Sequence, residues 1–183
     1  MSSIFPELQT PRIKLRELTE KDADVLFAMH SNYSIMQWYG TDHMTQREDA
    51  LALITTFANL RKLPSPGIRW GLCTHESNTL LGTCGFHRWN KEWNSCTIRY
   101  DLKVEARGKG YMQEALRCAI VWAFANMNLN RIEAQIHPNN RASILLVEKL
   151  GFVREGLARK AGYWGEQYYD LCFYSLLKSE FYG

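Results

Sequence analysis

The sequence predicts an α/β protein in which one mixed sheet is flanked by helices. Two observations lead to this prediction. Seven short segments alternate polar and apolar residues or are apolar throughout, as β-strands do. Four longer segments place apolar residues three or four positions apart, as amphipathic helices do. Because these segments follow one another in the order β-α-α-β-β-β-α-β-α-β-β, we expect one layered sheet.

Composition sets the broad class of protein. The chain has 183 residues, of which 46% are hydrophobic and 22% charged, so we expect one folded domain over residues 1–183. The net charge of +3 is too small to indicate a nucleic-acid partner. No apolar run approaches the roughly 20 residues that span a bilayer, and the N-terminus has no secretory signal pattern. We therefore expect a cytoplasmic monomer or homodimer that binds neither membranes nor nucleic acid.

The cysteines argue against a disulfide framework and against a zinc site. There are five, an odd number, and no two are separated by only two residues. We expect no bound metal, and we expect most of the cysteines to be small buried side chains.

The N-terminal third is predicted to contain one strand and two helices. Residues 12–16 alternate polar and apolar side chains, and a short helix follows. Residues 31–44 are irregular in pattern. The next helix begins with Thr45 as N-cap and Glu48 three positions later, a capping-box pattern, and it ends before the loop Pro64–Gly67.

The rest of the chain alternates strands and helices. A turn over residues 89–94, with two exposed tryptophans, separates two of the strands. Two helices are expected, at 112–127 and 141–150. The expected strands are 68–73, 80–86, 96–104, 131–137, 152–159 and 169–177.

The strongest chemical signal is a glycine-rich turn between a strand and a helix, Arg107-Gly108-Lys109-Gly110. Backbone N–H groups at a helix start, together with the helix dipole, attract anions, and two basic side chains add positive charge. A phosphate or pyrophosphate cradle is the functional interpretation, and an ordinary surface turn is the alternative. The sequence departs from a P-loop because Gly110 follows Lys109, and from a dinucleotide fingerprint because Gln113 replaces a glycine.

The stretch Arg107 to Met112 resembles the R/Q-x-x-G-x-G/A pyrophosphate loop of the GNAT acetyltransferases, with Met112 replacing the final Gly or Ala. Further matches resemble the RimJ/RimL-type branch of that family, which acetylates protein N-termini. They cover nearly the whole chain. They are the opening Thr10–Arg16, Tyr100 in the strand before the loop, Glu114-Ala115, Asn140 with Ser143, Glu148–Phe152, and Glu155-Gly156.

The resemblance implies the GNAT fold, a mostly antiparallel sheet of about seven strands. It also implies that the strands at about 95–104 and 131–137 splay apart to open a cleft. Acetyl-CoA is the implied cofactor. Its pyrophosphate would bind the turn, and its pantetheine arm would pair with the edge of the long strand. Asn140 would lie beside that arm, or it is simply a helix N-cap. The implied cofactor-binding residues are Leu102, Lys103, Val104, Arg107, Gly108, Lys109, Gly110, Tyr111, Met112 and Asn140.

Acetyl transfer to an amine requires a proton acceptor for the amine and a proton donor for the thiolate that leaves. The resemblance assigns the donor role to Ser143. The proton acceptor is unassigned, because Gly162 stands where some relatives carry a carboxylate. His87, Glu92 and Asp101 are candidate bases, an ordinary surface or sheet role is the alternative for each, and a water relay is an alternative to all three.

The amine substrate that accepts the acetyl group is expected to enter past residues 31–44, the Pro64–Gly67 loop and a loop over Tyr163–Tyr168. The implied activity is acetyl transfer to a primary amine, foremost the N-terminal α-amine of a protein such as a ribosomal protein, by direct attack in a ternary complex. A small amine (polyamine, amino acid, antibiotic or toxin) is an alternative acceptor, and a non-catalytic CoA-binding module is an alternative of another class. The rings expected to line the entrance are Tyr33, Trp38, Tyr39, Trp89, Tyr163 and Trp164.

Overall fold

One eight-stranded sheet organises the computed structural model, which describes residues 4–182. The strand order is β1-β2-β3-β4-β5-β6-β8-β7. Only β5 and β6 are parallel neighbours; the other pairs are antiparallel. Residues 1–3 and 183, the ends of the expected domain, lie outside the described part. The strands are β1 (Leu8–Gln9), β2 (Ile13–Arg16), β3 (Ile68–Thr74), β4 (Gly82–Asn90), β5 (Ser95–Leu102), β6 (Arg131–Ile136), β7 (Val153–Trp164) and β8 (Gln167–Leu177).

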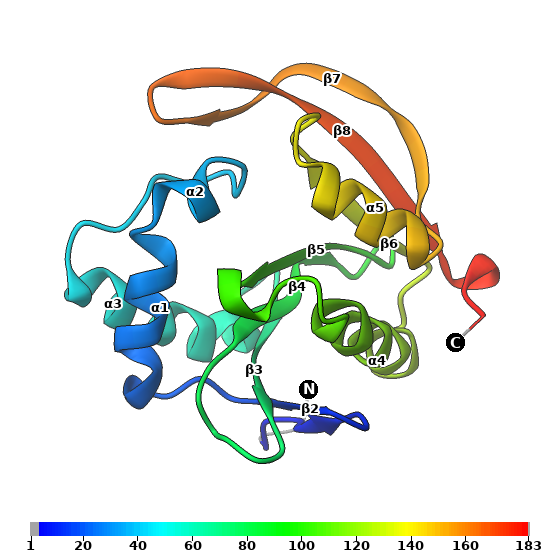
Figure 1. Cartoon of the computed structure of the whole chain (residues 1–183). Helices are drawn as coiled ribbons and strands as arrows, with labels where there is room; N and C mark the ends of the chain where they lie inside the picture. The colour runs from blue at the N-terminus through cyan, green and yellow to red at the C-terminus, as the bar shows by residue number, and fades with distance from the viewer. Residues whose placement is uncertain (1–3, 183) are drawn as a thin grey trace.

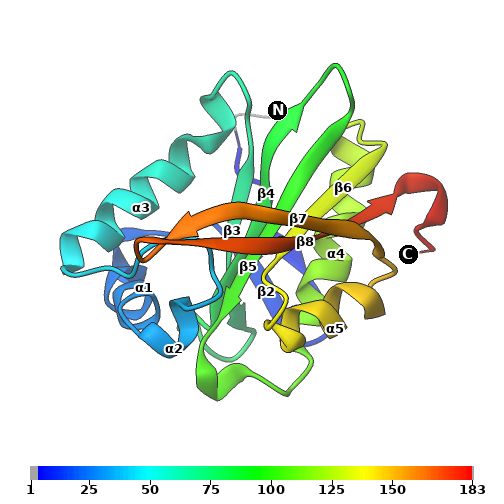
Figure 2. The same cartoon turned by 90° about the horizontal axis from the view of Figure 1, so that it is seen from above.

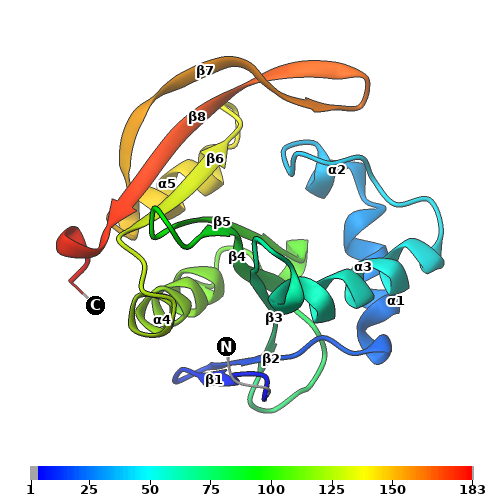
Figure 3. The ribbon, with the colours of Figure 1, turned by 180° about the vertical axis from the view of Figure 1, so that it is seen from behind.

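Helices gather on both sides of this sheet. Helices α1, α2 and α3 lie on one side, and α4 and α5 lie on the other (Figure 2). The long β7–β8 hairpin arches over the sheet and brings its tip towards α2 (Figures 1 and 3). The helices are α1 (Ala23–His30), α2 (Tyr33–Met36), α3 (Arg47–Asn59), α4 (Tyr111–Asn126) and α5 (Arg141–Lys149), with 3-10 turns at Glu20–Asp22, Leu60–Lys62, Val104–Ala106 and Lys178–Glu180.

The two faces of β3, β4 and β5 differ in chemistry, which explains the alternation in their sequences. One face packs its apolar side chains, such as Trp70, Phe86 and Ile98, in one buried cluster with residues of α4 and α5. Successive side chains in a strand point to opposite faces. The other face therefore presents a polar set, which we call the polar face of the sheet. It consists of Arg69, Thr83, His87, Thr97, Arg99 and Asp101.

The fold prediction is confirmed, including the separation of the two central strands. Strands β5 and β6 pair only over three positions, from Ser95 with Arg131 to Thr97 with Glu133. Beyond Thr97, β5 continues to Leu102 beside β4 while β6 diverges. The eighth strand, absent from the prediction, is the two-residue β1, which is too short to give a periodic signal.

The largest difference between the predicted and the observed elements is in the β7–β8 hairpin. The expected loop over Tyr163–Tyr168 does not exist, because β7 runs to Trp164 and β8 starts at Gln167. Only Gly165 and Glu166 form the turn, both with positive φ, as two-residue hairpin turns of the mirror-image type require. The interpretation as a loop was wrong because a Gly-Glu turn is a weak local signal.

Smaller corrections concern turns and caps. Residues 31–44 include the one-turn helix α2. Trp89 belongs to β4 and packs against the main core, so only Trp93 of the two tryptophans is exposed, at 77%. Helix α3 is capped by Gln46 and Asp49, one residue after the expected pair Thr45 and Glu48.

Two expectations about cysteines and membranes can be compared with the structure. Four of the five cysteines are buried as free thiols, and Cys118 is half-buried. Within residues 4–182, no helix combines the length and the apolar character needed to cross a membrane.

Candidate active site

A cavity of about 650 Å³ opens where β5 and β6 separate. Its walls come from β5, β6, α5, the turn before α4, the segment around α2 and the end of the β7–β8 hairpin. The lining includes Tyr100, which lies on the same face of β5 as Ile98, the apolar face, and also Arg99 and Asp101 from the polar face. The cavity therefore reaches through the sheet, so that groups approaching from its two faces can meet.

The glycine-rich turn forms one wall of this cavity. Gly108 and Gly110 have φ of +73° and +77°, a left-handed conformation that glycine adopts without steric cost. Gly110 is the N-cap of α4 and offers no side-chain cap, so the backbone N–H groups of the first helical turn lack intrahelical acceptors. A Cβ atom at Gly108 would meet nothing within 4 Å. The turn has the open space and the donors that an anion such as a pyrophosphate requires.

Thr10 and Arg12, in the turn between β1 and β2, hold the glycine-rich turn in place. The Arg12 guanidinium donates to the Lys109 carbonyl at 3.0 Å and forms an ion pair with Glu114 at 2.7 Å. The Thr10 hydroxyl also donates to Glu114, at 2.5 Å. Burial alone would raise the pKa of Glu114, but the hydrogen bonds from Thr10 and Arg12 outweigh it and lower that pKa. The T-x-R segment and the Glu114-Ala115 pair, distant in sequence, thus form one support.

Comparison with known proteins agrees with this geometry. The family model described as the acetyltransferase (GNAT) domain matches residues 12–153 of this sequence. The chain belongs to the GNAT acetyltransferase family. The uncharacterized N-acetyltransferase YoaA of Bacillus subtilis is 35% identical over 175 residues, covering 96% of this chain and 98% of that protein. This GNAT protein is therefore an N-acetyltransferase, and the cosubstrate of its family is acetyl-CoA.

Two further relatives bear on fold and acceptor. The solved structure of a probable acetyltransferase superimposes on this acetyltransferase with a TM-score of 0.84 at 27% identity, covering 96% of this chain and 98% of that chain. The [ribosomal protein uS5]-alanine N-acetyltransferase of Escherichia coli is 31% identical over 91 residues, which are 49% of this chain and 47% of that protein.

Most of the expected cofactor residues surround the cavity of this acetyltransferase, but not all. The lining includes Leu102 and Asn140 and all of the turn from Arg107 to Met112 except Lys109. The backbone N–H of Lys103 donates to the Leu81 carbonyl at 2.8 Å. This N–H group therefore points away from the cleft. Val104 starts a 3-10 turn and does not extend the strand.

Asn140 and Ser143 meet at the start of α5. The Asn140 side chain accepts the Ser143 backbone N–H at 3.2 Å, so it is the N-cap of this helix and also lines the cavity. The Ser143 side chain lines the cavity beside the Tyr100 phenol, and its hydrogen bond to that phenol partly offsets the rise that burial causes in the pKa of Tyr100. Tyr100 Oη lies 3.5 Å from the Ser143 carbonyl, and burial raises the pKa of Tyr100 to about 12, so this phenol stays protonated.

Asp101, the candidate base that lines the cavity, already accepts four hydrogen bonds from its neighbours. Its carboxylate accepts from His30 Nε2 at 2.9 Å, from Arg69 at 3.2 Å, and from the Thr83 N–H and hydroxyl at 2.8 Å. Burial would raise the pKa of Asp101, but the hydrogen bond from His30 and the charge of Arg69 outweigh it and hold the pKa far below the usual range. A carboxylate so stabilised is a weak proton acceptor.

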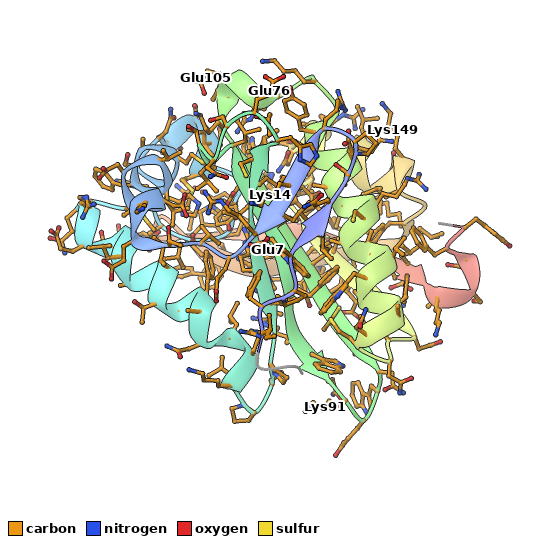
Figure 4. All side chains as sticks on the ribbon, turned by 90° about the horizontal axis from the view of Figure 1, so that it is seen from below. Glu7, Lys14, Glu76, Lys91, Glu105 and Lys149 are labelled. Atoms are coloured by element: carbon orange, nitrogen blue, oxygen red, sulfur yellow. The ribbon has the colours of Figure 1, made fainter. Side chains whose placement is uncertain are left out.

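The other two candidate bases lie outside the main cavity lining. Glu92 is exposed in the turn between β4 and β5; its neighbour Lys91 marks the tip of that hairpin, at the opposite end of the view from Glu105 (Figure 4). His87 lies on the polar face, lines a smaller adjoining cavity and has a buried Nε2 without a hydrogen-bond partner. Burial, with nearby arginine charges, lowers the pKa of His87 to about 3.

Sequence reasoning missed His137, which the structure places at the centre of an aromatic cluster on the cavity wall. Its ring stacks on Trp38 at 4.2 Å and meets Trp164 and Tyr169 edge-on. Its Nδ1 accepts the Asn139 N–H at 3.1 Å, which leaves Nε2 as the protonated nitrogen of the neutral ring. Its position at the end of a strand, three residues before Asn140, was the available signal.

Four of the six aromatic rings expected at the entrance line the cavity: Trp38, Tyr39, Tyr163 and Trp164. Tyr33 is 73% exposed and lies outside the lining. Trp89 also lies outside it, because it packs into the core.

The Trp164 ring fills the space that a side chain at Gly162 would need. A Cβ at Gly162 would lie 2.4 Å from Trp164 Cζ3. Trp164 is held by stacking on Tyr169 at 4.1 Å and by donating Nε1–H to the Gln37 carbonyl at 3.1 Å. The residue that some relatives use as a base is thus replaced here by an aromatic wall.

We predict that Gly162→Asp destabilises the protein and does not raise turnover. The new side chain displaces the Trp164 ring, an overpacking that costs about 1–3 kcal/mol in the free energy of unfolding, measured by urea denaturation. Gly156→Asp on the same strand is the matched control, because a Cβ there meets nothing within 4 Å. Equal stability of the two variants, or faster acetyl transfer in Gly162→Asp, would contradict this account.

Proposed function

We propose that the protein transfers the acetyl group of acetyl-CoA to the N-terminal α-amine of a protein, such as a ribosomal protein, by direct attack in a ternary complex, with residues 1–183 acting as one domain. The observation that carries the proposal is the cavity between β5 and β6, which is lined from both faces of the sheet. An acetyl donor bound at the glycine-rich turn and an amine on the polar face could meet there without a covalent enzyme intermediate. The partial likeness to the uS5-alanine N-acetyltransferase supports this acceptor class.

The groups that line the cavity then have the following roles. The backbone N–H groups from Gly108 to Met112 hold the pyrophosphate, and Arg107 adds charge beside them. The edge of β5 that β6 leaves unpaired after Thr97 can bind the pantetheine amides and the oxyanion of the tetrahedral intermediate. Ser143 donates a proton to the departing thiolate. Acetyl-CoA supplies the activated acyl group, and the amine proton passes to water or to a group that this site does not fix.

A polyamine is the less well supported acceptor. Polyamines carry several positive charges, and a site for them needs free carboxylates. The cavity lining has one carboxylate, Asp101, which is committed to Arg69 and His30, and it has four basic side chains, Arg88, Arg99, Arg107 and Lys149. This charge balance repels a polycation.

Two measurements test the proposal. Acetyl-CoA at a hundred times its Kd should stabilise the folded state by about 2.7 kcal/mol and raise the melting temperature. Thiol release should then be followed with N-terminal peptides, spermidine and single amino acids at equal concentration. We expect turnover with peptides to exceed turnover with spermidine by at least about tenfold in kcat/KM. Preference for spermidine would overturn the acceptor assignment, and absence of both stabilisation and thiol release would overturn the enzyme assignment.

A further inference from the structure

Two arginines that line the main cavity have no counter-charge in the structure. The side chains of Arg88 in β4 and Arg99 in β5 make no hydrogen bond or ion pair with any residue from 4 to 182. Arg99 is half-buried, and burial, together with the charges of Arg69 and Arg88, lowers its pKa against the opposing effect of Tyr39. An arginine that leaves water normally finds a carboxylate or carbonyl partner, and the half-buried Arg99 has none, whereas Arg88 is exposed. Both arginines belong to the lining of the main cavity.

The same two arginines also line a smaller cavity of about 230 Å³ beside the main one. Its other walls are His87, Thr97, Ile98 and Gln135. Arg88, Arg99, Ile98 and Gln135 belong to both linings, so the two cavities adjoin. The polar groups of the small cavity are donors or neutral groups, and no carboxylate is among its lining residues.

The backbone and the buried imidazole both point to a bound group. Arg88 has a positive φ of 52°, and the β4–β5 register shifts between His87 and Asn90, a bulge of the kind that redirects a side chain next to a site. His87 Nε2 is buried without a partner. Burial first, and then the charges of Arg69, Arg99 and Arg88, lower the pKa of His87, so the imidazole is neutral and the local field is positive. The neutral imidazole can still donate one N–H.

We propose that the small cavity binds an anionic group of the acceptor, the carboxylate of an acidic side chain within the first three residues of the peptide whose N-terminus is acetylated. Arg99 and Arg88 supply the counter-charge, with donors from His87 and Gln135 beside them. These four are specificity residues, since they contact the acceptor away from the reacting amine. This inference rests on the proposed function and narrows it to acidic N-termini.

The test compares matched peptides that differ at one position. Ala-Glu, Ala-Gln and Ala-Lys at the start of an otherwise identical sequence are assayed by thiol release with saturating acetyl-CoA. We expect kcat/KM for the Glu peptide to exceed that for the Gln peptide about tenfold, and the Lys peptide to be the poorest, as loss of a charge-assisted hydrogen bond predicts. Arg99→Gln should remove most of this preference while leaving the acetyl-CoA thermal shift unchanged. Arg99→Glu should reverse it in favour of the Lys peptide.

Arg117→Gln on the exposed surface of α4 is the matched control and should keep the preference of the unmodified protein. Equal rates for the three peptides in a working enzyme would overturn this inference and leave the proposed function standing. Free glutamate outcompeting the Glu peptide would overturn the peptide origin of the carboxylate. Absence of any peptide acetylation would instead remove the proposed function itself. An Arg99→Gln variant with a lowered melting temperature is to be replaced by Arg88→Gln, which is exposed and tests the same loss of preference.

Discussion

Replacing Asp101 by asparagine is expected to lower the free energy of unfolding by about 3–5 kcal/mol, the cost of leaving a buried charge without its partner. The side chains of Asp101 and Arg69 are 2% and 1% exposed, and that of His30 is 2% exposed. Asparagine keeps the shape of the carboxylate but removes the charge opposite Arg69, whose Nη1 already lacks a hydrogen-bond partner. Urea denaturation at pH 7 measures the loss.

The same group gives the protein a pH dependence whose sign is fixed. The pKa of Asp101 is lower in the folded than in the unfolded state, where it is about 3.9. Its contribution is therefore fully present above about pH 4 and is lost as the pH falls from there through the folded pKa. We expect the unmodified protein to lose stability in that acid range, and Asp101→Asn to lose less over the same interval.

Asp24→Asn is the control for removal of a carboxylate from an ion pair. Asp24 pairs with Arg47 at the surface, where its side chain is 75% exposed, so the change in stability should be small. If Asp101→Asn and Asp24→Asn unfold at the same urea concentration, the Asp101 carboxylate does not stabilise the buried cluster as expected.

Ser143→Ala should lower kcat for peptide acetylation about 10²-fold, the smaller end of the range for general acid catalysis. The substitution removes only the hydroxyl. The cap of α5 uses the Ser143 backbone N–H, and the 3.5 Å contact of Tyr100 Oη uses the Ser143 carbonyl, so both persist in alanine. Only the interaction of the Ser143 hydroxyl with Tyr100 is lost. The acetyl-CoA thermal shift and the KM for acetyl-CoA should stay close to those of the unmodified protein.

Two companion variants make the result interpretable. Ser34→Ala changes another serine of the cavity lining, one on α2, and should leave turnover nearly unchanged. Tyr100→Phe tests the phenol closest to Ser143, which stays protonated at neutral pH. Unchanged turnover in Ser143→Ala together with a large loss in Tyr100→Phe would move the acid role to Tyr100.

Local sequence was sufficient for most elements of the fold. The alternation in β3, β4 and β5 and the helical period of α4 reflect which face is buried, so they survive in the chain as a pattern. The glycine-rich turn could also be predicted from the sequence, because the left-handed backbone at Gly108 and Gly110 favours glycine. The extent of β7 was not, because its exposed residues carry no burial period and its turn is short.

The sequence by itself therefore determined the fold class, the anion-binding turn and, through an ordered set of motifs, the family. Tertiary structure alone decided which candidate groups meet. It placed Asp101 in a saturated buried cluster and Glu92 on a distant hairpin, and it brought His137 among aromatic rings. It also placed two arginines with unpaired side chains, from adjacent strands, in the lining of one small cavity. The reason is physical: local patterns record burial and backbone conformation, whereas the protonation and partners of a side chain depend on contacts between residues far apart in the chain.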